Sequence, residues 1–297
     1  MNKQERYYLC MRTLDLDALL IFRTVAEQGG ITRAATKLNR VQSNVTTRVK
    51  QLEERLGTQL FTRTRNRLTL SPEGRLLLAY ADELLRLASE AQAAVKSGRP
   101  RGVFRIGTLE STAAARLPAI LARYHRAYPE VQIELVTGTS GALVARVHAL
   151  EIEAAFVAEP FTAAGLETEH AFDEELVVIQ PRSRPAIRSP HDVSGRTVIA
   201  FSTGCSYRRR LEEWLAGAGV VPSQVMEFAS YHAIIACVAA GAGIAVVPRS
   251  VLKVANAEKA VVIGKLPPRT ARARTMLAWR AGHRSIALEA LVAEVRR

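Results

Sequence analysis

The sequence predicts an α/β protein in which a helical N-terminal region precedes a region of alternating strands and helices. Two observations predict this division. Up to about residue 97, apolar residues recur at three- and four-residue intervals, which is the spacing of one helix face. From residue 103 onward, short β-like runs alternate with helical segments, a pattern that favours a largely parallel sheet.

Positive charge is concentrated in the N-terminal region. The chain of 297 residues has a formal net charge of +13, and residues 31–70 contribute nine Lys or Arg against two Glu. In residues 101–297, 24 basic side chains accompany 18 acidic ones over a much longer stretch. We therefore expect a polyanionic partner to bind the N-terminal region.

Several classes of protein are disfavoured. The cysteines, Cys10, Cys205 and Cys237, lack C-x-x-C spacing and a His cluster, so we expect neither a disulfide scaffold nor a metal site. No catalytic constellation is visible, so we expect no enzyme and no cofactor beyond a small-molecule effector. Residues 1–10 lack a secretory apolar run, and the apolar stretch 233–247 is too short to span a membrane. These features predict a cytoplasmic protein with no membrane partner.

The first two predicted helices are separated by glycines. Apolar residues recur at helical spacing from Leu16 to Val25, and the Gly29-Gly30 pair tolerates the left-handed conformation common at helix ends. Thr32 is expected to cap the second helix. Asn39-Arg40 is then expected to form a tight corner before a third helix.

The third predicted helix directs polar side chains outward. Val45, Val49, Leu52 and Leu56 fall at i, i+4, i+7 and i+11, so the residues between them point to solvent. Amides, hydroxyls and cations of that kind pair with base edges and phosphates. The pattern predicts a helix-turn-helix that binds double-stranded DNA, and a solvated amphipathic helix is the alternative. The candidate DNA-binding residues here are Thr32, Arg33, Gln42, Ser43, Asn44, Thr46, Thr47, Arg48 and Lys50.

A basic hairpin follows this helix. Two short strands, at 60–61 and 68–70, flank the segment "TRTRNR" and predict a wing. Arg63, Arg65 and Arg67 are expected to meet phosphates or the minor groove, adding affinity and salt dependence more than base preference.

A long helix is predicted after the wing. Ser71-Pro72-Glu73 supplies an N-cap, a proline at the first helical position and an early acid. The helix runs to about Lys96, with apolar residues near heptad spacing at Leu77, Leu84, Ala88, Ala91 and Val95. The expected partner is a second copy of the chain, giving a homodimer; packing against the winged region of the same chain is the alternative. Ser97-Gly98-Arg99-Pro100 is expected to end this helix and lead into a hinge.

Strand ends in the C-terminal region carry polar residues. In α/β sheets ligands bind beyond the carboxyl ends of strands, where helix N-termini point. We predict a small-molecule site there, with ordinary helix capping as the alternative. Arg208 is expected to pair with a ligand carboxylate, whereas Glu110 is either selective for an amine or solvated. The candidate effector-binding residues are Thr108, Glu110, Ser111, Thr137, Thr139, Ser202, Thr203, Cys205, Tyr207, Arg208 and Tyr231.

The cysteines of this region receive different interpretations. Cys205 is placed at a helix start next to Arg208, where a thiolate would be favoured, so it is a candidate redox sensor. Cys237 lies in the apolar run "AIIACVAAG" and is expected to be a core residue.

Residues 22–85 closely resemble the N-terminal domain of LysR-type transcriptional regulators. The resemblance implies a winged helix-turn-helix, a dimerising linker helix and a two-lobed effector domain like type 2 periplasmic binding proteins. It also implies a homotetramer that bends promoter DNA in response to a small molecule, and contact with RNA polymerase in an activator. Positions in the family's order are Ala34-Ala35, Leu38, Gln42-Ser43, Gln51-Leu52-Glu53, Leu56-Gly57, Leu60-Phe61 and Leu70-Ser71-Pro72-Glu73-Gly74.

The predicted domain organisation follows from the residues and this resemblance. The function expected is effector-modulated, sequence-specific DNA binding; the alternative is a soluble small-molecule binding protein or enzyme with a basic N-terminal assembly segment. The expected parts are an extension (1–10), a winged helix-turn-helix (11–70), a linker helix (71–97), a hinge (98–102) and an effector domain (103–297), whose first lobe comprises 103–160 and 266–297 and whose second comprises 161–265.

Overall fold

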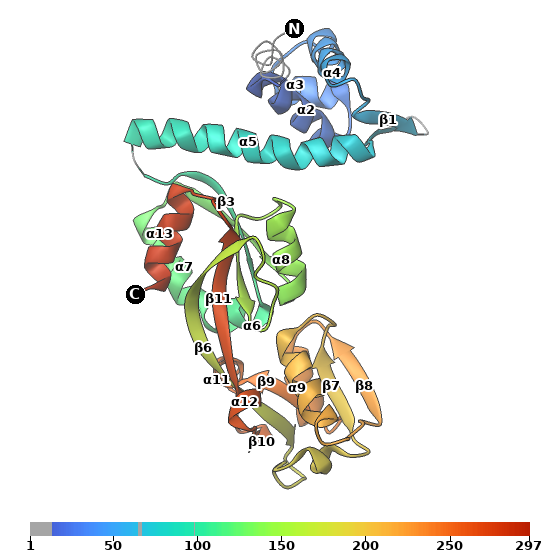
Figure 1. The fold of residues 1–297 in the computed structure, drawn as a ribbon, viewed down its shortest axis with the longest axis vertical. Coiled ribbons are helices and arrows are strands. Elements are labelled where there is room, and N and C mark those ends of the chain that lie inside the picture. Colours follow the sequence, from blue (N-terminus) through green and yellow to red (C-terminus); the bar gives the residue numbers. More distant parts are fainter. Residues whose placement is uncertain (1–13, 65–66, 98) are drawn as a thin grey trace. The chain divides into compact units, whose positions relative to one another are not determined.

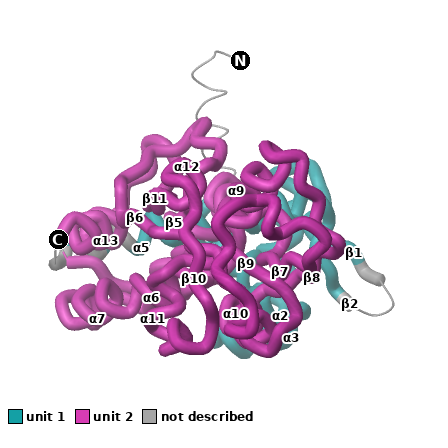
Figure 2. Tube along the Cα trace, turned by 90° about the horizontal axis from the view of Figure 1, so that it is seen from below, with its two compact units in different colours: residues 1–98 teal, residues 99–297 magenta. Residues whose placement is uncertain are grey.

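The chain divides into two compact units, Met1–Gly98 and Arg99–Arg297 (Figure 2). The computed structural model describes residues 14–64, 67–97 and 99–297 (Figure 1). The predicted extension 1–10, Arg65 and Gly98 of the predicted hinge lie outside the described residues. Within the described part of the chain, every helix is too short or too polar to cross a lipid bilayer.

The first unit begins with α2 (Leu16–Gln28), α3 (Ile31–Lys37) and α4 (Gln42–Leu56). Gly29 ends α2 with a left-handed φ of 61°, as its sequence position predicts. The capping role predicted for Thr32 is wrong. Because α3 already begins at Ile31, Thr32 lies inside the helix, and its carbonyl accepts a hydrogen bond from the Thr36 hydroxyl.

Apolar side chains of these three helices form the core of the first unit. Val45, Val49 and Leu52 of α4 are buried, which confirms the predicted inward face, and Leu56 is partly buried against the same core. The Phe22 ring of α2 packs against Phe61, with ring centroids 5.3 Å apart. The opposite face of α4 is thereby turned away from the core.

The wing consists of β1 (Phe61–Thr64) and β2 (Arg67–Leu70), paired antiparallel. Glu53 of α4 fixes its first strand, because Oε1 accepts hydrogen bonds from the backbone N–H groups of Leu60 at 2.8 Å and Phe61 at 3.2 Å. The long helix α5 (Pro72–Ser97) follows directly. Its start is capped as predicted, since the Ser71 hydroxyl accepts a hydrogen bond from the Gly74 N–H at 2.8 Å.

The second unit is built on a mixed sheet. Its strand order is β10-β6-β11-β5-β3-β4, with β9 paired to β6, and β7 and β8 form a separate parallel pair. The prediction of a largely parallel sheet is wrong, because β6 and β11 pair antiparallel with their neighbours. The strands are β3 (Gly102–Thr108), β4 (Val131–Thr137), β5 (Ala154–Ala158), β6 (Leu166–Pro181), β7 (Thr197–Phe201), β8 (Gln224–Phe228), β9 (Ala245–Pro248), β10 (Val261–Lys265) and β11 (Arg272–Arg280).

Strand β6 runs through both lobes of this unit (Figure 1). Its segment up to Glu175 pairs with β11, and its segment from Leu176 pairs with β9 and β10. The partner of β6 thus changes between Glu175 and Leu176, and the lobe boundary at residues 160 and 161 stays a prediction. The apolar run "LVVIQP" at 176–181 predicts a strand, whereas the charged segment 166–175 does not. The charged segment nevertheless continues the strand and belongs to the sheet of the first lobe.

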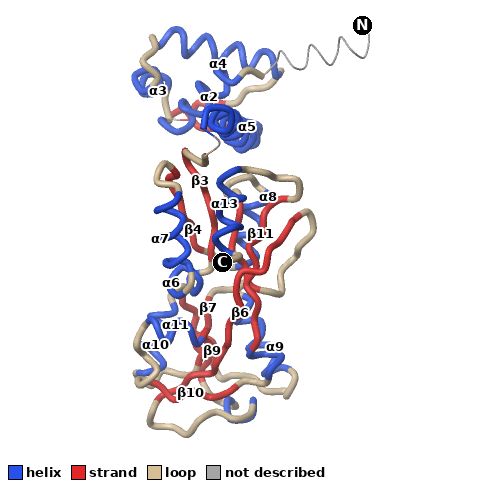
Figure 3. Tube along the Cα trace, turned by 90° about the vertical axis from the view of Figure 1, so that its left-hand side faces the viewer, coloured by secondary structure: helices blue, strands red, loops and turns tan. Residues whose placement is uncertain are grey.

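Helices cover the strands of both lobes; α10 and α9 lie on opposite sides of β7 and β9 (Figure 3). The alternating pattern of the sequence predicts one helix over 113–128, but this segment contains the end of one helix and the whole of a second. The two helices meet at Arg116, because Pro118 has no N–H to continue the hydrogen-bonded ladder. The helices are α6 (Glu110–Ala115), α7 (Leu117–Ala127), α8 (Ser140–His148), α9 (Ser206–Ala216), α10 (Tyr231–Ala239), α11 (Arg249–Val254), α12 (Pro268–Ala271) and α13 (Ile286–Val295), with a 3-10 helix at Pro190–Val193.

Gly74 permits the close approach of α5 to the start of the wing. A Cβ at this position would lie 2.1 Å from the Leu60 carbonyl oxygen, a backbone atom that cannot easily move. We expect Gly74→Ala to destabilise the first unit by about 1–3 kcal/mol, the usual cost of overpacking. Thermal denaturation followed by circular dichroism measures this. Gly141→Ala is the control, since nothing lies within 4 Å of the position that its added methyl group would take; equal melting temperatures for the two variants would contradict the prediction.

Candidate functional site

The outward face of α4 is a continuous polar surface. Thr46 and Arg48 are partly exposed, and the Thr46 hydroxyl donates a hydrogen bond to the Gln42 carbonyl at 2.9 Å. The other predicted residues of this helix are exposed. The exposed residues are Gln42, Ser43, Asn44, Thr47 and Lys50.

Two predicted DNA-binding residues belong to α3, the helix that precedes α4, and they differ in whether a hydrogen bond already occupies their side chains. Thr32 is exposed. Arg33 is also exposed, yet its Nε donates a hydrogen bond to the Gln28 carbonyl at 2.6 Å, so its guanidinium stabilises the end of α2. Arg33 must exchange this bond to reach a phosphate.

Acidic residues of α2 and its N-cap neutralise several of the counted cations. Arg40 donates to both carboxylate oxygens of Asp17, at 2.6 and 3.0 Å, and Arg48 lies 3.7 Å from the same side chain. Lys37 pairs in the same way with Glu27 at 2.9 Å. Lys50, by contrast, forms no ion pair with any described residue. The surplus of charge in residues 31–70 therefore overstates the number of free cations.

For Arg63 and Arg67 of the wing, the structure gives the positions in the strand register but not the side chains. Arg63 lies opposite Leu68 in the hairpin, and Arg67 lies opposite Thr64. The side chains of Arg63 and Arg67, like the whole of Arg65, lie outside what the structure describes. Their predicted phosphate contacts stay predictions.

A second candidate site is a small cavity between the two lobes, which we call the interlobe cavity. Its volume is about 10 Å³, room for roughly one water molecule. It brings together six of the predicted effector-binding residues: Glu110, Ser111, Thr139, Cys205, Tyr207 and Tyr231. The remaining lining residues were not among the predicted effector-binding residues, although Leu109, Gly138 and Ser206 lie in the strand-end segments that predicted the site; the other two are Ala158 and Phe201.

Five predicted residues do not line the interlobe cavity: Thr108, Thr137, Ser202, Thr203 and Arg208. Arg208 is held elsewhere, since its Nε donates to Glu212 at 2.7 Å and its Nη1 to Glu227 at 2.6 Å. These bonds raise the pKa of Arg208 and occupy the donors that were expected to grip a ligand carboxylate. Glu212, at i+4 on the same helix, was the sequence signal for this pairing.

Buried hydroxyls join the two lobes next to the interlobe cavity, which Ser206 lines and Ser140 does not. Ser140 of α8 and Ser206 of α9 lie 2.9 Å apart and are both buried. Each also lies within hydrogen-bonding distance of the Ala158 carbonyl, at 3.1 and 2.7 Å, and the Ser140 hydroxyl accepts from the Ala158 N–H. These polar groups are satisfied within the protein and hold the ends of β5, α8 and α9 together.

Glu110, a residue of the first lobe, forms a second contact between the lobes. Its Oε1 accepts a hydrogen bond from the Tyr231 N–H at the start of α10, at 3.3 Å. Its Oε2 is buried and has no hydrogen-bond partner. Burial raises the pKa of Glu110, opposed by the Tyr231 hydrogen bond and by the nearby His232.

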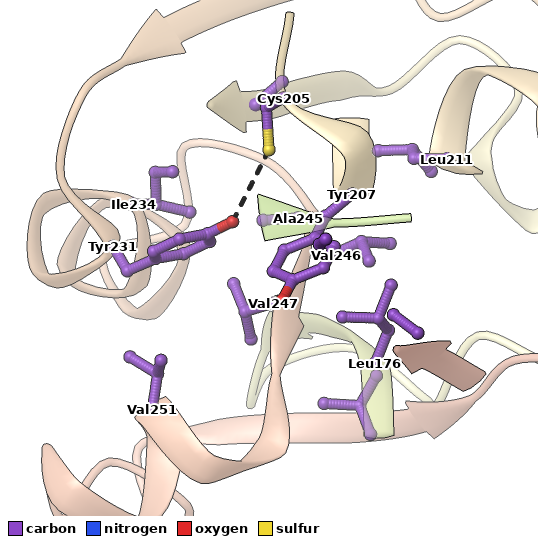
Figure 4. Close-up of a cluster of buried hydrophobic side chains, with 14 of the residues drawn as sticks. Leu176, Cys205, Tyr207, Leu211, Tyr231, Ile234, Ala245, Val246, Val247 and Val251 are labelled. Atoms are coloured by element: carbon purple, nitrogen blue, oxygen red, sulfur yellow. Dashed lines mark hydrogen bonds between the residues drawn. The ribbon is translucent and has the colours of Figure 1, made fainter. Parts of the chain in front are cut away.

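The redox role considered for Cys205 is not supported by its surroundings. Cys205 is 7% exposed, and its sulfur lies 3.8 Å from the Tyr231 hydroxyl, in an apolar cluster that includes Val247 (Figure 4). Burial raises the pKa of the Cys205 thiol, and this outweighs the opposing effects of the backbone N–H groups and of Arg208. The protonated thiol is a poor nucleophile. Cys237 is partly buried and packs against the core, as expected.

Models of known protein families match both units. A model described as the LysR substrate binding domain matches residues 97–297, and one described as the bacterial regulatory helix-turn-helix protein of the lysR family matches residues 16–75. The chain belongs to the LysR family. This assignment identifies a DNA-binding transcription regulator with an effector-binding domain, and it favours regulation over the alternative of an assembly segment on an enzyme.

Individual relatives agree with the family assignment. The HTH-type transcriptional regulator GltR of Bacillus subtilis is 41% identical over 240 residues, covering 80% of this chain and 81% of GltR. YusT of the same organism, an uncharacterised HTH-type regulator, is 41% identical over 258 residues, covering 86% of each chain. Family members are transcription regulators and not enzymes.

Solved structures share the fold of this LysR-family chain. A full-length OxyR variant from Pseudomonas aeruginosa has a TM-score of 0.74 at 22% identity and covers 95% of both chains. Full-length CbnR in complex with its target DNA has a TM-score of 0.68 at 23% identity, covering 96% of this chain and 99% of CbnR.

Burial of Cys205 makes its reactivity testable. In a Cys10→Ser, Cys237→Ser variant, we expect Cys205 to react with iodoacetamide at pH 8 at least about tenfold more slowly than in the urea-unfolded chain, because the raised pKa leaves less thiolate and burial limits access. Mass spectrometry of timed samples measures the rate. Equal rates in the folded and unfolded chain would restore Cys205 as a candidate sensor.

Proposed function

We propose that this regulator binds promoter DNA sequence-specifically by inserting α4 into the major groove. The observation that carries the proposal is the division of α4 into a buried seam through Val45, Val49 and Leu52 and an exposed face of amides, hydroxyls and Lys50. A helix of this kind fits the major groove with its polar face toward the base edges.

The exposed residues of α4 divide by chemistry. Gln42 and Asn44 are exposed in the first turn, where recognition helices contact bases, and their amides can pair two-fold with adenine. Lys50, free of an acidic partner among the described residues, is suited to a phosphate. Arg63, Arg65 and Arg67 of the wing are proposed to add further phosphate contacts.

We further propose that a small-molecule effector acts at the interlobe cavity. Lining groups from both lobes meet there, as Glu110 does with the Tyr231 N–H, and the Ser140–Ser206 pair joins the lobes beside it. A ligand that replaces some of these contacts must favour one separation of the lobes over another. If the separation of the lobes differs between DNA-bound states, the effector favours the state that it binds more tightly. The resulting change in promoter binding is set by the ratio of the effector's affinities for those states.

Self-association through α5 completes the proposal. Apolar side chains at Leu76, Tyr80, Leu84, Leu87 and Val95 are exposed along one stripe of α5, with Val95 89% exposed. Leu77, which was assigned to the predicted seam, instead packs against the core of its own unit. A homodimer through this stripe, assembled further into a homotetramer, matches paired DNA half-sites. RNA polymerase is a partner if the regulator activates transcription.

Variants of α4 distinguish base contacts from phosphate contacts. Gln42→Ala should cost about 1–3 kcal/mol on the preferred sequence and relax base preference. Lys50→Ala should weaken all DNA similarly and reduce the slope of log affinity against log salt by about one. Fluorescence anisotropy with the upstream intergenic duplex and a scrambled duplex, at several KCl concentrations, measures both effects.

Arg146→Ala is the charge-matched control for Lys50→Ala, since Arg146 is a half-exposed cation of the second unit. The major-groove proposal fails if Gln42→Ala leaves the ratio of specific to scrambled affinity unchanged, or if Arg146→Ala changes the salt slope as much as Lys50→Ala.

The α5 stripe predicts the effect of a charge on assembly. Leu87 is 50% exposed within the stripe, whereas Ser89 is exposed outside it. Leu87→Glu should raise the dimer dissociation constant at least about tenfold, because it buries a charge where an apolar side chain packs. Sedimentation equilibrium measures this, with Ser89→Glu as the control on the same helix. Equal dissociation constants for the two variants would exclude this stripe as the interface.

A further inference from the structure

We propose that the effector is a small organic cation, an ammonium group carrying a short apolar chain, and not a carboxylate. This inference rests on the proposed role of the interlobe cavity as the effector site and specifies the chemistry of its ligand. It is carried by the charge, the unpartnered oxygen atoms and the aromatic rings that the cavity presents.

The lining of the interlobe cavity contains one carboxylate and no cation. Glu110 is its only charged side chain, and none of its lining residues is Lys, Arg or His. Arg208, which directly follows the lining residue Tyr207 in the chain, donates hydrogen bonds to Glu212 and Glu227 instead. An anionic ligand would place its charge beside the Glu110 carboxylate with no cation in the lining to compensate it, and like charges at such short range repel.

The Glu110 carboxylate has an unused acceptor at the cavity. Oε1 accepts the Tyr231 N–H, whereas Oε2 is buried without a hydrogen-bond partner. A buried carboxylate oxygen left unpaired is costly, and an N–H donor that carries positive charge compensates it best. Burial raises the pKa of Glu110, and a cation bound to it would lower that pKa again.

A hydroxyl of the cavity lining can accept a hydrogen bond from a further N–H group of the ammonium. The Tyr207 hydroxyl is buried and makes no hydrogen bond of normal geometry, although it faces the hydroxyls of Ser111 and Thr275. Ser140 and Ser206 are already satisfied by each other and by Ala158, so they are not free to bind an anion as donors.

Aromatic rings provide a surface for the cation and its apolar chain. Phe201 and Tyr231 both line the cavity and stack on each other, with centroids 5.0 Å apart and an angle of 22° between the ring planes. The negative face of an aromatic ring attracts an ammonium group. The same rings exclude water from the apolar chain.

The volume of the cavity limits the size of the ligand that fits without a separation of the lobes. A space of about 10 Å³ accepts one ammonium head group, so a longer chain requires the lobes to separate at the Glu110 and Tyr231 contact. Binding of such a cation therefore favours a more open arrangement of the lobes.

Matched probes test the charge requirement on the full-length protein. The probes are n-butylammonium, n-butyrate and n-butanamide, which share an apolar chain and differ in charge, compared at equal ionic strength by calorimetry and by shift of the melting temperature. We expect n-butylammonium to bind and the other two not to bind. Glu110→Gln should weaken the amine about 10- to 100-fold, the range for loss of a charged hydrogen bond.

Glu151→Gln is the matched control, because it removes the same charge from a side chain that is 59% exposed and not part of the cavity lining. Amine binding should also weaken as the pH falls, because protonation neutralises Glu110, whose Oε1 lies 4.0 Å from Nδ1 of His232. The raised pKa of Glu110 places its own contribution to this loss at a higher pH than for an unburied glutamate.

The outcomes separate this inference from the proposed function. Binding of n-butyrate in preference to n-butylammonium, or binding of none of the probes, overturns the cation assignment. Equal amine affinity in Glu110→Gln and Glu151→Gln also overturns it. If the amine binds through Glu110 but leaves the affinity for promoter DNA unchanged in anisotropy measurements, the cation assignment stands and effector control through this cavity fails.

Discussion

The antiparallel pairing of β6 with β11 is the constraint on which the second unit depends. β6 joins the sheet of one lobe through Glu175 and the sheet of the other from Leu176, so the lobes share one continuous strand. Next to this crossing, the buried carboxylate of Glu174 accepts hydrogen bonds from Arg116 at 2.6 Å and from the Ser250 hydroxyl at 2.8 Å. Across the interlobe cavity the same lobes are joined again at their helix starts, by Ser140 with Ser206 and by Glu110 with the Tyr231 N–H.

Periodicity predicted the parts of the fold that local spacing determines. The buried face of α4, the end of α2 at Gly29 and the cap at Ser71 were all predicted, since each depends on residues within one or two helical turns. Strand β6 was only half predicted. Its segment 166–175 is rich in charged residues, and it is a strand because β11 pairs with it, a partner about a hundred residues away in the chain.

Candidate site residues could be predicted where their position depends on the end of a strand. They could not be predicted where a residue distant in the chain determines the orientation of the side chain. Glu110, Thr139 and Tyr207 follow expected strand ends and do line the interlobe cavity. Arg208 also follows one, but Glu227, from β8, draws its guanidinium away. The thiolate expected at Cys205 failed for a related reason: a helix start favours ionisation, but the depth of burial, which the sequence does not display, opposes it more strongly.

The carboxylates around α2 act as internal counterions for the DNA-binding unit. Asp15, Asp17 and Glu27 hold Arg55, Arg40 and Lys37, so these cations must abandon a protein partner before they can meet a phosphate. Such exchange adds little net attraction, whatever the nucleotide sequence. A protein with fewer free cations than its composition suggests should dwell more briefly on random DNA, so its choice of site would depend more on the uncharged amides and hydroxyls proposed to contact base edges.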